Sequence, residues 1–167
     1  IGVSGLPCGC SDFAFRVEGQ RCETLFNNGE PPLVPTPPLG ASVLSSGLLS
    51  SAQVADDFAV SLQSDVLVCA LGAVVYTNCD PVLGGFALYA TRCSTADGAP
   101  LLSVPFSRAV DLGYDVQLDG RTLRAYRVEA FDLAWYLHGD RNYALSVRLT
   151  GSGSLNQRGV WAYADNC

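Results

Sequence analysis

The chain has 167 residues, and its 16 acidic side chains outnumber its 10 basic ones, which gives a net charge of −6. An acidic chain without clustered cations is unsuited to nucleic acid or anionic membrane, because phosphates are bound by clustered positive charge. The longest apolar run, residues 66–76, is shorter than the about 20 residues that a membrane-spanning helix needs.

Cysteine content indicates the compartment. The chain has seven cysteines but neither methionine nor lysine, and no cysteine spacing matches a metal or haem motif. We therefore expect a processed, exported domain that is secreted, extracellular or displayed at the cell surface, where disulfides persist.

The first 50 residues differ in composition from the rest. Three cysteines fall within residues 1–30, and residues 31–40 contain five prolines, which predicts an extended, polyproline-like chain. The alternating run 13–18 predicts a short strand. We expect residues 1–50 to form a Cys-rich, Pro-spaced N-terminal arm or cap, and residues 51–167 to form the main domain.

From residue 53 onward, segments with two-residue alternation recur at short intervals with turn residues between them. The dipeptide Asp119-Gly120 joins two of them and suits a type I′ hairpin turn, because both positions tolerate positive φ. The pattern predicts an all-β fold, an antiparallel β-sandwich of jelly-roll type. The expected strands are residues 54–60, 66–77, 85–93, 101–108, 113–118, 122–131, 133–137, 143–149 and 159–164.

All seven cysteines are disulfide candidates, and their connectivity is open. They are Cys8, Cys10, Cys22, Cys69, Cys79, Cys93 and Cys167. Because the number is odd, one thiol is left over, either as a free thiol or as a bridge between subunits. If the chain turns near Pro81, Cys69 and Cys93 fall opposite each other on neighbouring antiparallel strands, at a spacing that a disulfide can bridge. Cys79–Cys93 is the alternative pair.

Catalytic motifs are not evident, and we expect the protein not to be an enzyme. The single histidine, His138, lies in a turn-like sequence, and no Gly-x-Ser-x-Gly elbow is present. Asp111, Asp115 and Asp119 are spaced along a predicted strand, and paired carboxylates are the tools of glycosidases. Sixteen acidic residues, however, produce such spacings by chance.

Two groups of residues are candidates for ligand binding. Asp56 and Asp57 begin the sandwich and could coordinate calcium together with backbone carbonyls, although a solvated strand end or a hydrogen-bonded corner is the simpler explanation. Calcium is the only cofactor that these residues suggest. Exposed aromatic rings on a β-sandwich stack on sugars, whereas core packing is the alternative role. The aromatic candidates are Trp135, Tyr136, Trp161 and Tyr163.

The main domain resembles a group of secreted bacterial proteins. Residues 54–58 (VADDF), residues 85–89 (GFALY) and residues 141–147 (RNYALSV) resemble secreted bacterial β-sandwich domains that open with an "ADDF" strand. Such domains look like surface or extracellular-matrix proteins. The resemblance begins after the N-terminal arm and implies an extracellular β-sandwich without a particular activity or functional residue.

Two functions follow from these features. The first is an extracellular structural protein, a self-assembling subunit of a filament or surface layer, in which Phe13, Phe15 and Val17 of the arm add to a neighbour's sheet edge. A head-to-tail contact of this kind produces a fibre, whereas an arm that folds back on its own domain leaves a monomer. The second is a carbohydrate-binding module, with or without calcium. The expected partners are therefore a second copy of the chain or a glycan.

Overall fold

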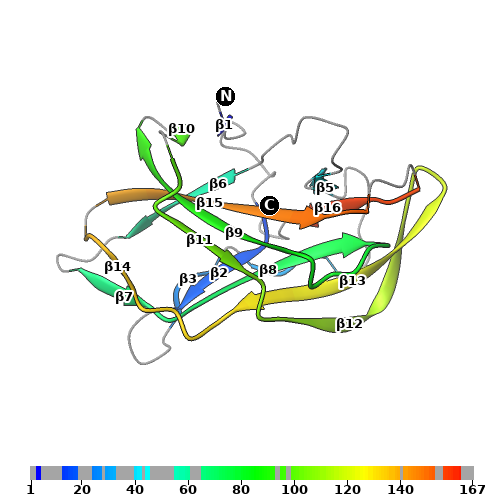
Figure 1. The fold of residues 1–167 in the computed structure, drawn as a ribbon, viewed down its shortest axis with the longest axis horizontal. Coiled ribbons are helices and arrows are strands. Elements are labelled where there is room, and N and C mark those ends of the chain that lie inside the picture. The colour runs from blue at the N-terminus through cyan, green and yellow to red at the C-terminus, as the bar shows by residue number, and fades with distance from the viewer. Residues whose placement is uncertain are drawn as a thin grey trace.

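Every regular element in the described part of the chain is a β-strand, and the computed structural model arranges these strands as a sandwich of two sheets (Figure 1). The all-β, antiparallel sandwich expected from the alternating pattern is thus confirmed. The described residues are 3–4, 13–18, 24–27, 29–32, 40–42, 44–45, 55–60, 65–92, 95–96, 99–139, 141–152 and 156–162. They contain no helix with the length and apolarity required to cross a membrane.

The first sheet is centred on two long antiparallel strands, β9 (Gly84–Arg92) and β15 (Arg141–Thr150). Shorter strands extend it on both sides: β11 and β10 pair with β9, β1 pairs with β10, and β6 and β5 pair with β15. The β15–β5 ladder is parallel. The bounds of the shorter strands are β1 (Val3–Ser4), β5 (Leu44–Ser45), β6 (Ala55–Val60), β10 (Thr95–Ala96) and β11 (Leu102–Pro105).

The second sheet is centred on β8 (Ala70–Thr77), which pairs with β13 (Arg121–Ala130) along one edge. The opposite edge of β8 is divided between two short strands, β2 (Phe15–Glu18) and β16 (Gly159–Ala162). Outer strands complete the sheet: β12 (Arg108–Leu118) on β13, β3 (Thr24–Asn27) on β2 and β4 (Gly40–Ser42) on β16.

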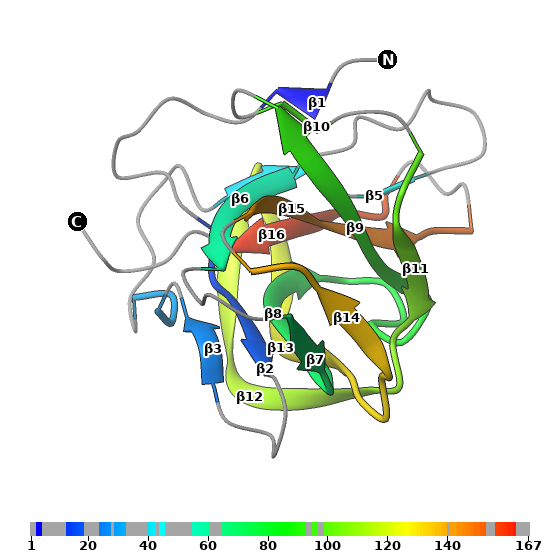
Figure 2. The same ribbon diagram turned by 90° about the vertical axis from the view of Figure 1, so that its left-hand side faces the viewer.

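A two-stranded ribbon, β7 (Val66–Val68) with β14 (Trp135–Leu137), lies at one end of the sandwich (Figures 1 and 2). The expected strand 66–77 therefore contains a break at Cys69, which separates β7 from β8. There the Cys69 amide donates to the Glu18 carbonyl, and the Cys69 carbonyl accepts from the Leu133 amide. These bonds replace the ladder at the break. Each of the other eight expected segments contains a strand.

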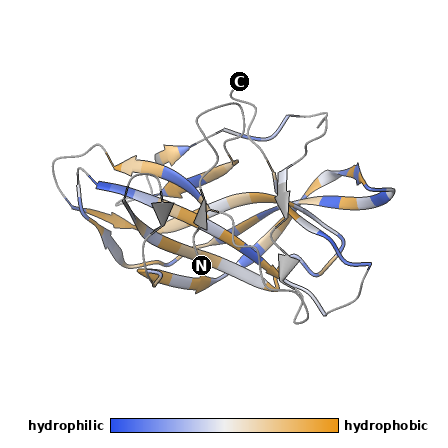
Figure 3. Ribbon diagram, turned by 90° about the horizontal axis from the view of Figure 1, so that it is seen from above, coloured by the Kyte–Doolittle hydropathy of each residue, from blue (hydrophilic) through white to orange (hydrophobic). Residues whose placement is uncertain are grey.

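Alternation along the strands explains the core between the sheets, and Figure 3 shows it as bands of apolar and polar colour. Phe86 and Leu88 of β9 and Leu145 and Val147 of β15 face side chains of the second sheet such as Val75. The central strand β8 is buried on both faces, because a second apolar cluster that includes Tyr76, Leu123 and Val160 covers its outer side. Two buried faces account for the nearly continuous apolar sequence of β8.

The Asp119-Gly120 turn forms as expected. Asp119 has φ of 50° and Gly120 has φ of 71°, which are the two positive values of a type I′ turn, and they connect β12 directly to β13. Further along β12, a bulge between Asp111 and Asp115 contains Gly113 with φ of 86°. Beyond this bulge the tip of the β12–β13 hairpin bends, as Figure 1 shows at its right-hand side.

The strands on either side of Pro81 are not neighbours, contrary to the geometry on which a Cys69–Cys93 bridge was expected. β8 pairs with β13 and β9 pairs with β15, so the two strands lie in different sheets. Alternation identifies the buried face of a strand but not its partner. The pairing itself is untested, since Cys8, Cys10, Cys22, Cys93 and Cys167 lie outside the described residues.

The N-terminal strand β2 is part of the sandwich core of its own chain. Phe13, Phe15 and Val17, which sequence analysis assigned to an arm outside the main core, are buried in the cluster between the sheets. Their burial has a simple cause: β16 covers β8 only at Val75–Thr77, and β2 fills the remaining edge at Ala70–Ala73. Pairing of these residues with a neighbour therefore requires that the strand leave its own sheet.

Candidate functional site

A groove of about 590 Å³ opens at the end of the sandwich where the β14–β7 ribbon lies. Four parts of the chain form it: the end of β9, the residue before β11, strand β14 with the residue that follows, and the start of β15. Its lining residues are Ala90, Thr91, Leu101, Trp135, Tyr136, His138, Arg141, Asn142 and Tyr143. We refer to it as the aromatic groove.

Two aromatic side chains of the groove come from β14. Tyr136 is 62% exposed, the most exposed of the large apolar or aromatic side chains in the described residues. Trp135 is half-buried and packs partly against the core cluster. Pairing of β14 with β7, which places Tyr136 opposite Leu67, fixes the strand that presents both rings. The groove therefore combines an anchored indole with a solvent-facing phenol ring.

Polar groups surround the two rings. The His138 Nδ1 atom lies 3.0 Å from Asp65 Oδ1, and both side chains are more than half exposed. The hydroxyl of buried Tyr143 accepts a hydrogen bond from the His138 amide at 2.8 Å and donates one to the His138 carbonyl at 3.3 Å. Tyr143 thereby holds the backbone that carries the imidazole, while Asp65 orients its ring.

Arg141 and Asn142 add hydrogen-bonding capacity at the start of β15, where both are exposed. Together with His138 they provide a guanidinium, an amide and an imidazole next to two aromatic rings. Such a set can donate and accept several hydrogen bonds while an apolar ring face of a ligand lies against Tyr136 or Trp135. It suits recognition of a neutral, hydroxyl-rich ligand.

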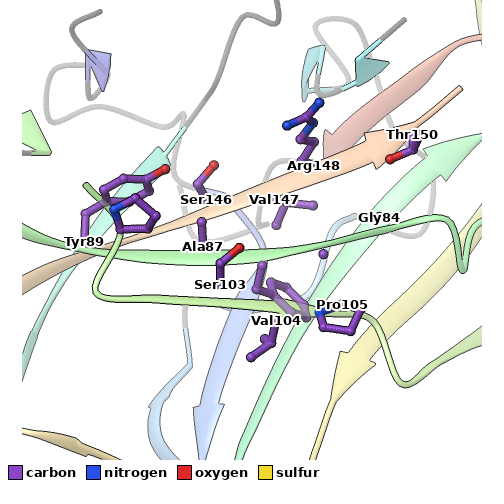
Figure 4. A pocket seen from close by; sticks show the side chains of 13 residues that line it. Gly84, Ala87, Tyr89, Ser103, Val104, Pro105, Ser146, Val147, Arg148 and Thr150 are labelled. Carbon is purple, nitrogen blue, oxygen red and sulfur yellow. The ribbon is translucent and has the colours of Figure 1, made fainter. Parts of the chain in front are cut away.

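A second groove, of about 560 Å³, lies across β9, β11 and β15 (Figure 4). Its floor is a row of small side chains, because Ser103 pairs with Ala87 and Ala87 pairs with Ser146 across the three strands. Figure 4 shows Tyr89 at one end and Arg148 with Thr150 at the other. Ser146 is 1% exposed, and its hydroxyl has no hydrogen-bond partner in the described part of the chain. Without an exposed aromatic ring, this groove lacks a platform for stacking.

Of the four aromatic candidates from the sequence, Trp161 has a different role from Trp135 and Tyr136, which line the groove. Trp161 is fully buried, stacks on Phe13 with ring centroids 4.3 Å apart, and donates from Nε1 to the Ala14 carbonyl at 3.1 Å. It has the core-packing role that was its alternative, because β2 covers it. Tyr163 lies outside the described residues. The glycan-binding candidates that reach a common groove are thus Trp135 and Tyr136.

The described contacts give Asp56 a structural role, and calcium binding by Asp56 and Asp57 with backbone carbonyls stays a prediction. Asp56 Oδ2 accepts a hydrogen bond from the Phe13 amide at 2.8 Å, and Asp56 Oδ1 accepts one from the Asp57 amide at 3.1 Å. Within the described ranges, no three His, Cys, Asp or Glu side chains gather into a group that could hold a metal ion. Asp56 instead ties the entrance of β2 to β6.

The acidic residues spaced along β12 have structural partners. Arg124 of β13 binds Asp111 Oδ1 at 2.8 Å and Asp115 Oδ1 at 3.1 Å, and the Gly113 amide donates to Asp111 at 2.8 Å. The hydrogen bond from the Gly113 amide and, after it, the bond from Arg124 lower the pKa of Asp111. Asp119 lies in the turn beyond them. The described contacts therefore assign Asp111 and Asp115 to the β12 bulge rather than to a pair of catalytic acids.

The sequence alone indicates the two rings of the groove but not its polar residues. His138 lies in the loop that follows β14, as its sequence predicts, whereas no sequence motif links Asp65, Arg141 and Asn142 to a site. Their nearness depends on β14 returning beside β7 and on β15 starting at the same end of the sandwich. Comparisons with protein-family models, curated proteins and solved structures give no match. The interpretation of this site therefore depends on its geometry.

Proposed function

We propose that this protein is an extracellular carbohydrate-binding module and that the aromatic groove is its glycan site. One observation carries the proposal: the exposed Tyr136 and the half-buried Trp135 open onto one groove with His138, Arg141 and Asn142. Aromatic rings provide flat apolar surface at a low cost in conformational entropy. The polar side chains beside them match the hydroxyls of a sugar.

The character of the groove favours a neutral or weakly acidic saccharide. Arg141 supplies a positive charge at the groove, and Asp65 lies behind His138 rather than among the lining residues. The net charge of −6 of the whole chain disfavours highly anionic polymers as partners. Secretion or display at the cell surface, which the seven cysteines suggest, would bring the groove to such ligands.

A glycan array with the oxidised full chain, run with and without calcium, tests the proposal. We expect at least one neutral oligosaccharide to bind, and we expect Tyr136→Ala to weaken its affinity at least tenfold in titration calorimetry. Because Tyr136 is 62% exposed, its removal should change the free energy of unfolding by less than about 0.5 kcal/mol. An array without any bound glycan in either condition would contradict the proposal.

Phe131→Ala is the matched control for the Tyr136 variant. Phe131 is also an exposed aromatic residue, 42% accessible, but it lies beneath the Arg108 guanidinium and away from the lining of the groove. It should retain the affinity of the unmodified chain. Equal loss in both variants would indicate a general surface effect and would count against a site at Tyr136.

A further inference from the structure

The groove across β9, β11 and β15 is a trough on the face of the first sheet that points away from the core (Figure 4). Its floor is low because small residues occupy the middle of all three strands: Ser103 pairs with Ala87, and Ala87 pairs with Ser146. Gly85 continues this floor, since a Cβ at that position would collide with the Val104 carbonyl oxygen. The volume of about 560 Å³ lies in the range of cavities that hold small molecules.

A buried hydroxyl group lines this trough. Ser146 is 1% exposed, and its Oγ atom has no hydrogen-bond partner in the described part of the chain. Buried polar atoms are normally hydrogen-bonded, and a serine hydroxyl can both donate and accept. Ser146 therefore offers a hydrogen bond to a molecule in the trough, at a place where no described group of the protein takes it up.

Charge is distributed unevenly along the trough. Arg148 is the only charged side chain among the described lining residues, and it lies at one end, in register with Gly85. Tyr89 lies at the other end, in register with Ala144, whose partner on β6 is the exposed Asp57. Four residues along β15 separate the two ends, or about 13 Å at the rise of an antiparallel strand. The trough therefore suits a ligand whose negative charge lies at the Arg148 end, away from Asp57.

Ser146 and Arg148 are placed to bind one anionic group together. They are two residues apart on β15, so their side chains lie on the same face of the strand with Cα atoms about 7 Å apart. Figure 4 shows both side chains rising from β15 on the same side. The planar fork of a guanidinium matches a carboxylate, and a carboxylate oxygen can also accept a hydrogen bond from a serine hydroxyl.

We infer that this trough is a second ligand site, which takes a small amphipathic monocarboxylate. Its carboxylate binds the Arg148 guanidinium and the Ser146 hydroxyl, and its apolar body lies over Ala87 and Gly85 toward Tyr89. The single cation of the described lining matches a single negative charge, and the small side chains of the floor leave room for the apolar body. The inference does not depend on the glycan site, because the two grooves share no described lining residue.

An NMR titration of the oxidised full chain with two carboxylates, hydrocinnamate and octanoate, tests the inference. The neutral amide of each acid is the matched ligand, because it keeps the shape and removes the charge. We expect at least one of the two acids to bind, with its amide binding at least fivefold more weakly, and we expect the largest shifts at backbone amides of β9, β11 and β15. Equal affinity for acid and amide, or no binding of either acid, would overturn the inference.

Two variants examine the groups that would hold the carboxylate. Arg148→Gln should weaken binding of the acid at least fivefold, whereas Arg108→Gln, which removes an exposed arginine outside the trough, should not. Ser146→Ala should weaken binding at least threefold and at the same time raise the urea midpoint of the ligand-free chain, because it removes a buried hydroxyl without a described partner. Unchanged affinity in Arg148→Gln or in Ser146→Ala would contradict the assigned contacts.

Two further variants separate the trough from the aromatic groove. Ser103 is exposed on β11, so Ser103→Tyr fills the mouth of the trough without disturbing the core, and it should abolish binding of the acid while keeping the affinity for a glycan. Tyr136→Ala should do the reverse. Loss of acid binding in Tyr136→Ala, or its retention in Ser103→Tyr, would place the acid outside the trough. A glycan array without any bound glycan would leave this second site unaffected.

Discussion

The two hairpins of the second sheet differ in what holds them. The β12–β13 hairpin has long strands and a tight turn at Asp119-Gly120, and its paired residues extend from Arg108 with Glu129 to Leu118 with Arg121. The β2–β3 hairpin has strands of only four residues each. Each hairpin contains one register irregularity, between Asp111 and Asp115 in β12–β13 and between Val17 and Glu18 in β2–β3. In the β2–β3 hairpin, Phe15 is buried between the sheets and Phe26 is partly buried against the same cluster, whereas much of β12 is exposed.

The difference shows that one hairpin is stabilised by its own turn and cross-strand pairs, whereas the other is stabilised by contacts with the rest of the fold. In β12–β13, turn chemistry and cross-strand pairs next to the turn favour the hairpin from within. In β2–β3, little in the hairpin itself favours pairing, because a hairpin this short is marginal in water without a hydrophobic partner. Contacts with Phe58, Trp161 and β8 supply the stability, so this hairpin should respond mainly to changes in the core.

The largest effect is expected from Phe15→Ala, which removes the ring at the centre of the hairpin's contacts. The ring centroids of Phe15 and Phe26 are 5.1 Å apart, and the Phe15 ring also contacts the rings of Phe58 and Trp161. Truncation of a buried phenylalanine lowers the free energy of unfolding by about 3–5 kcal/mol. Urea unfolding measures this loss, and Phe15→Leu, which keeps most of the volume, should lose less than about 1.5 kcal/mol. Similar small losses in both variants would refute tertiary control of this hairpin.

A smaller effect is expected from Gly120→Ala in the turn of the other hairpin. Gly120 has φ of 71°, and a Cβ there would meet no atom within 4 Å. The change therefore tests backbone conformation alone and should lower the free energy of unfolding by about 1–2 kcal/mol. Asp119→Asn is the control, since asparagine also tolerates positive φ, and it should unfold at the same urea concentration as the unmodified chain. An unchanged midpoint for Gly120→Ala would show that the turn does not specify β12–β13.

The same contrast explains which parts of the fold the sequence predicts. Local signals, namely two-residue alternation and the Asp119-Gly120 turn, predict where most strands lie and how β12 meets β13. They do not predict that β8 and β9 enter different sheets, or that residues 13–18 complete β8. Strand pairing over long sequence separations depends on the competition among edges, and no short window of sequence contains that information.

The candidate site shows the same limit at the level of single residues. Trp135 and Trp161 both occur in short strands with an aromatic neighbour nearby, and the sequence treats them alike. The structure separates them, because Phe13 stacks on Trp161 whereas Trp135 lines the groove at the open end of the sandwich. Phe13, the residue that covers Trp161, is 148 positions away in the chain. The burial of Trp161 can therefore be predicted only if the pairing of β2 is known.

The smallest effect concerns the bulge of β12, where local contacts act through charge. The Gly113 amide and then Arg124 lower the pKa of Asp111. Because the pKa is lowered, the ionised carboxylate stabilises the fold at pH values above the ordinary aspartate pKa of 3.8. This contribution to stability disappears as the pH falls through the folded-state pKa. Because Asp111 is exposed, its contribution to stability is small and sensitive to salt.

Arg124→Gln should raise the pKa of Asp111 toward its ordinary value without reaching it, because the Gly113 amide still donates to the carboxylate. A carboxyl-carbon NMR titration of Asp111 measures this shift directly. Arg108→Gln is the matched control: it removes an exposed arginine of β12 that binds Glu129 instead of Asp111, and it should leave the titration of Asp111 in place. If Arg124→Gln also leaves the titration unchanged, the bulge is held by the backbone bond alone, and the local specification of β12–β13 would lie in its turn and register rather than in its charges.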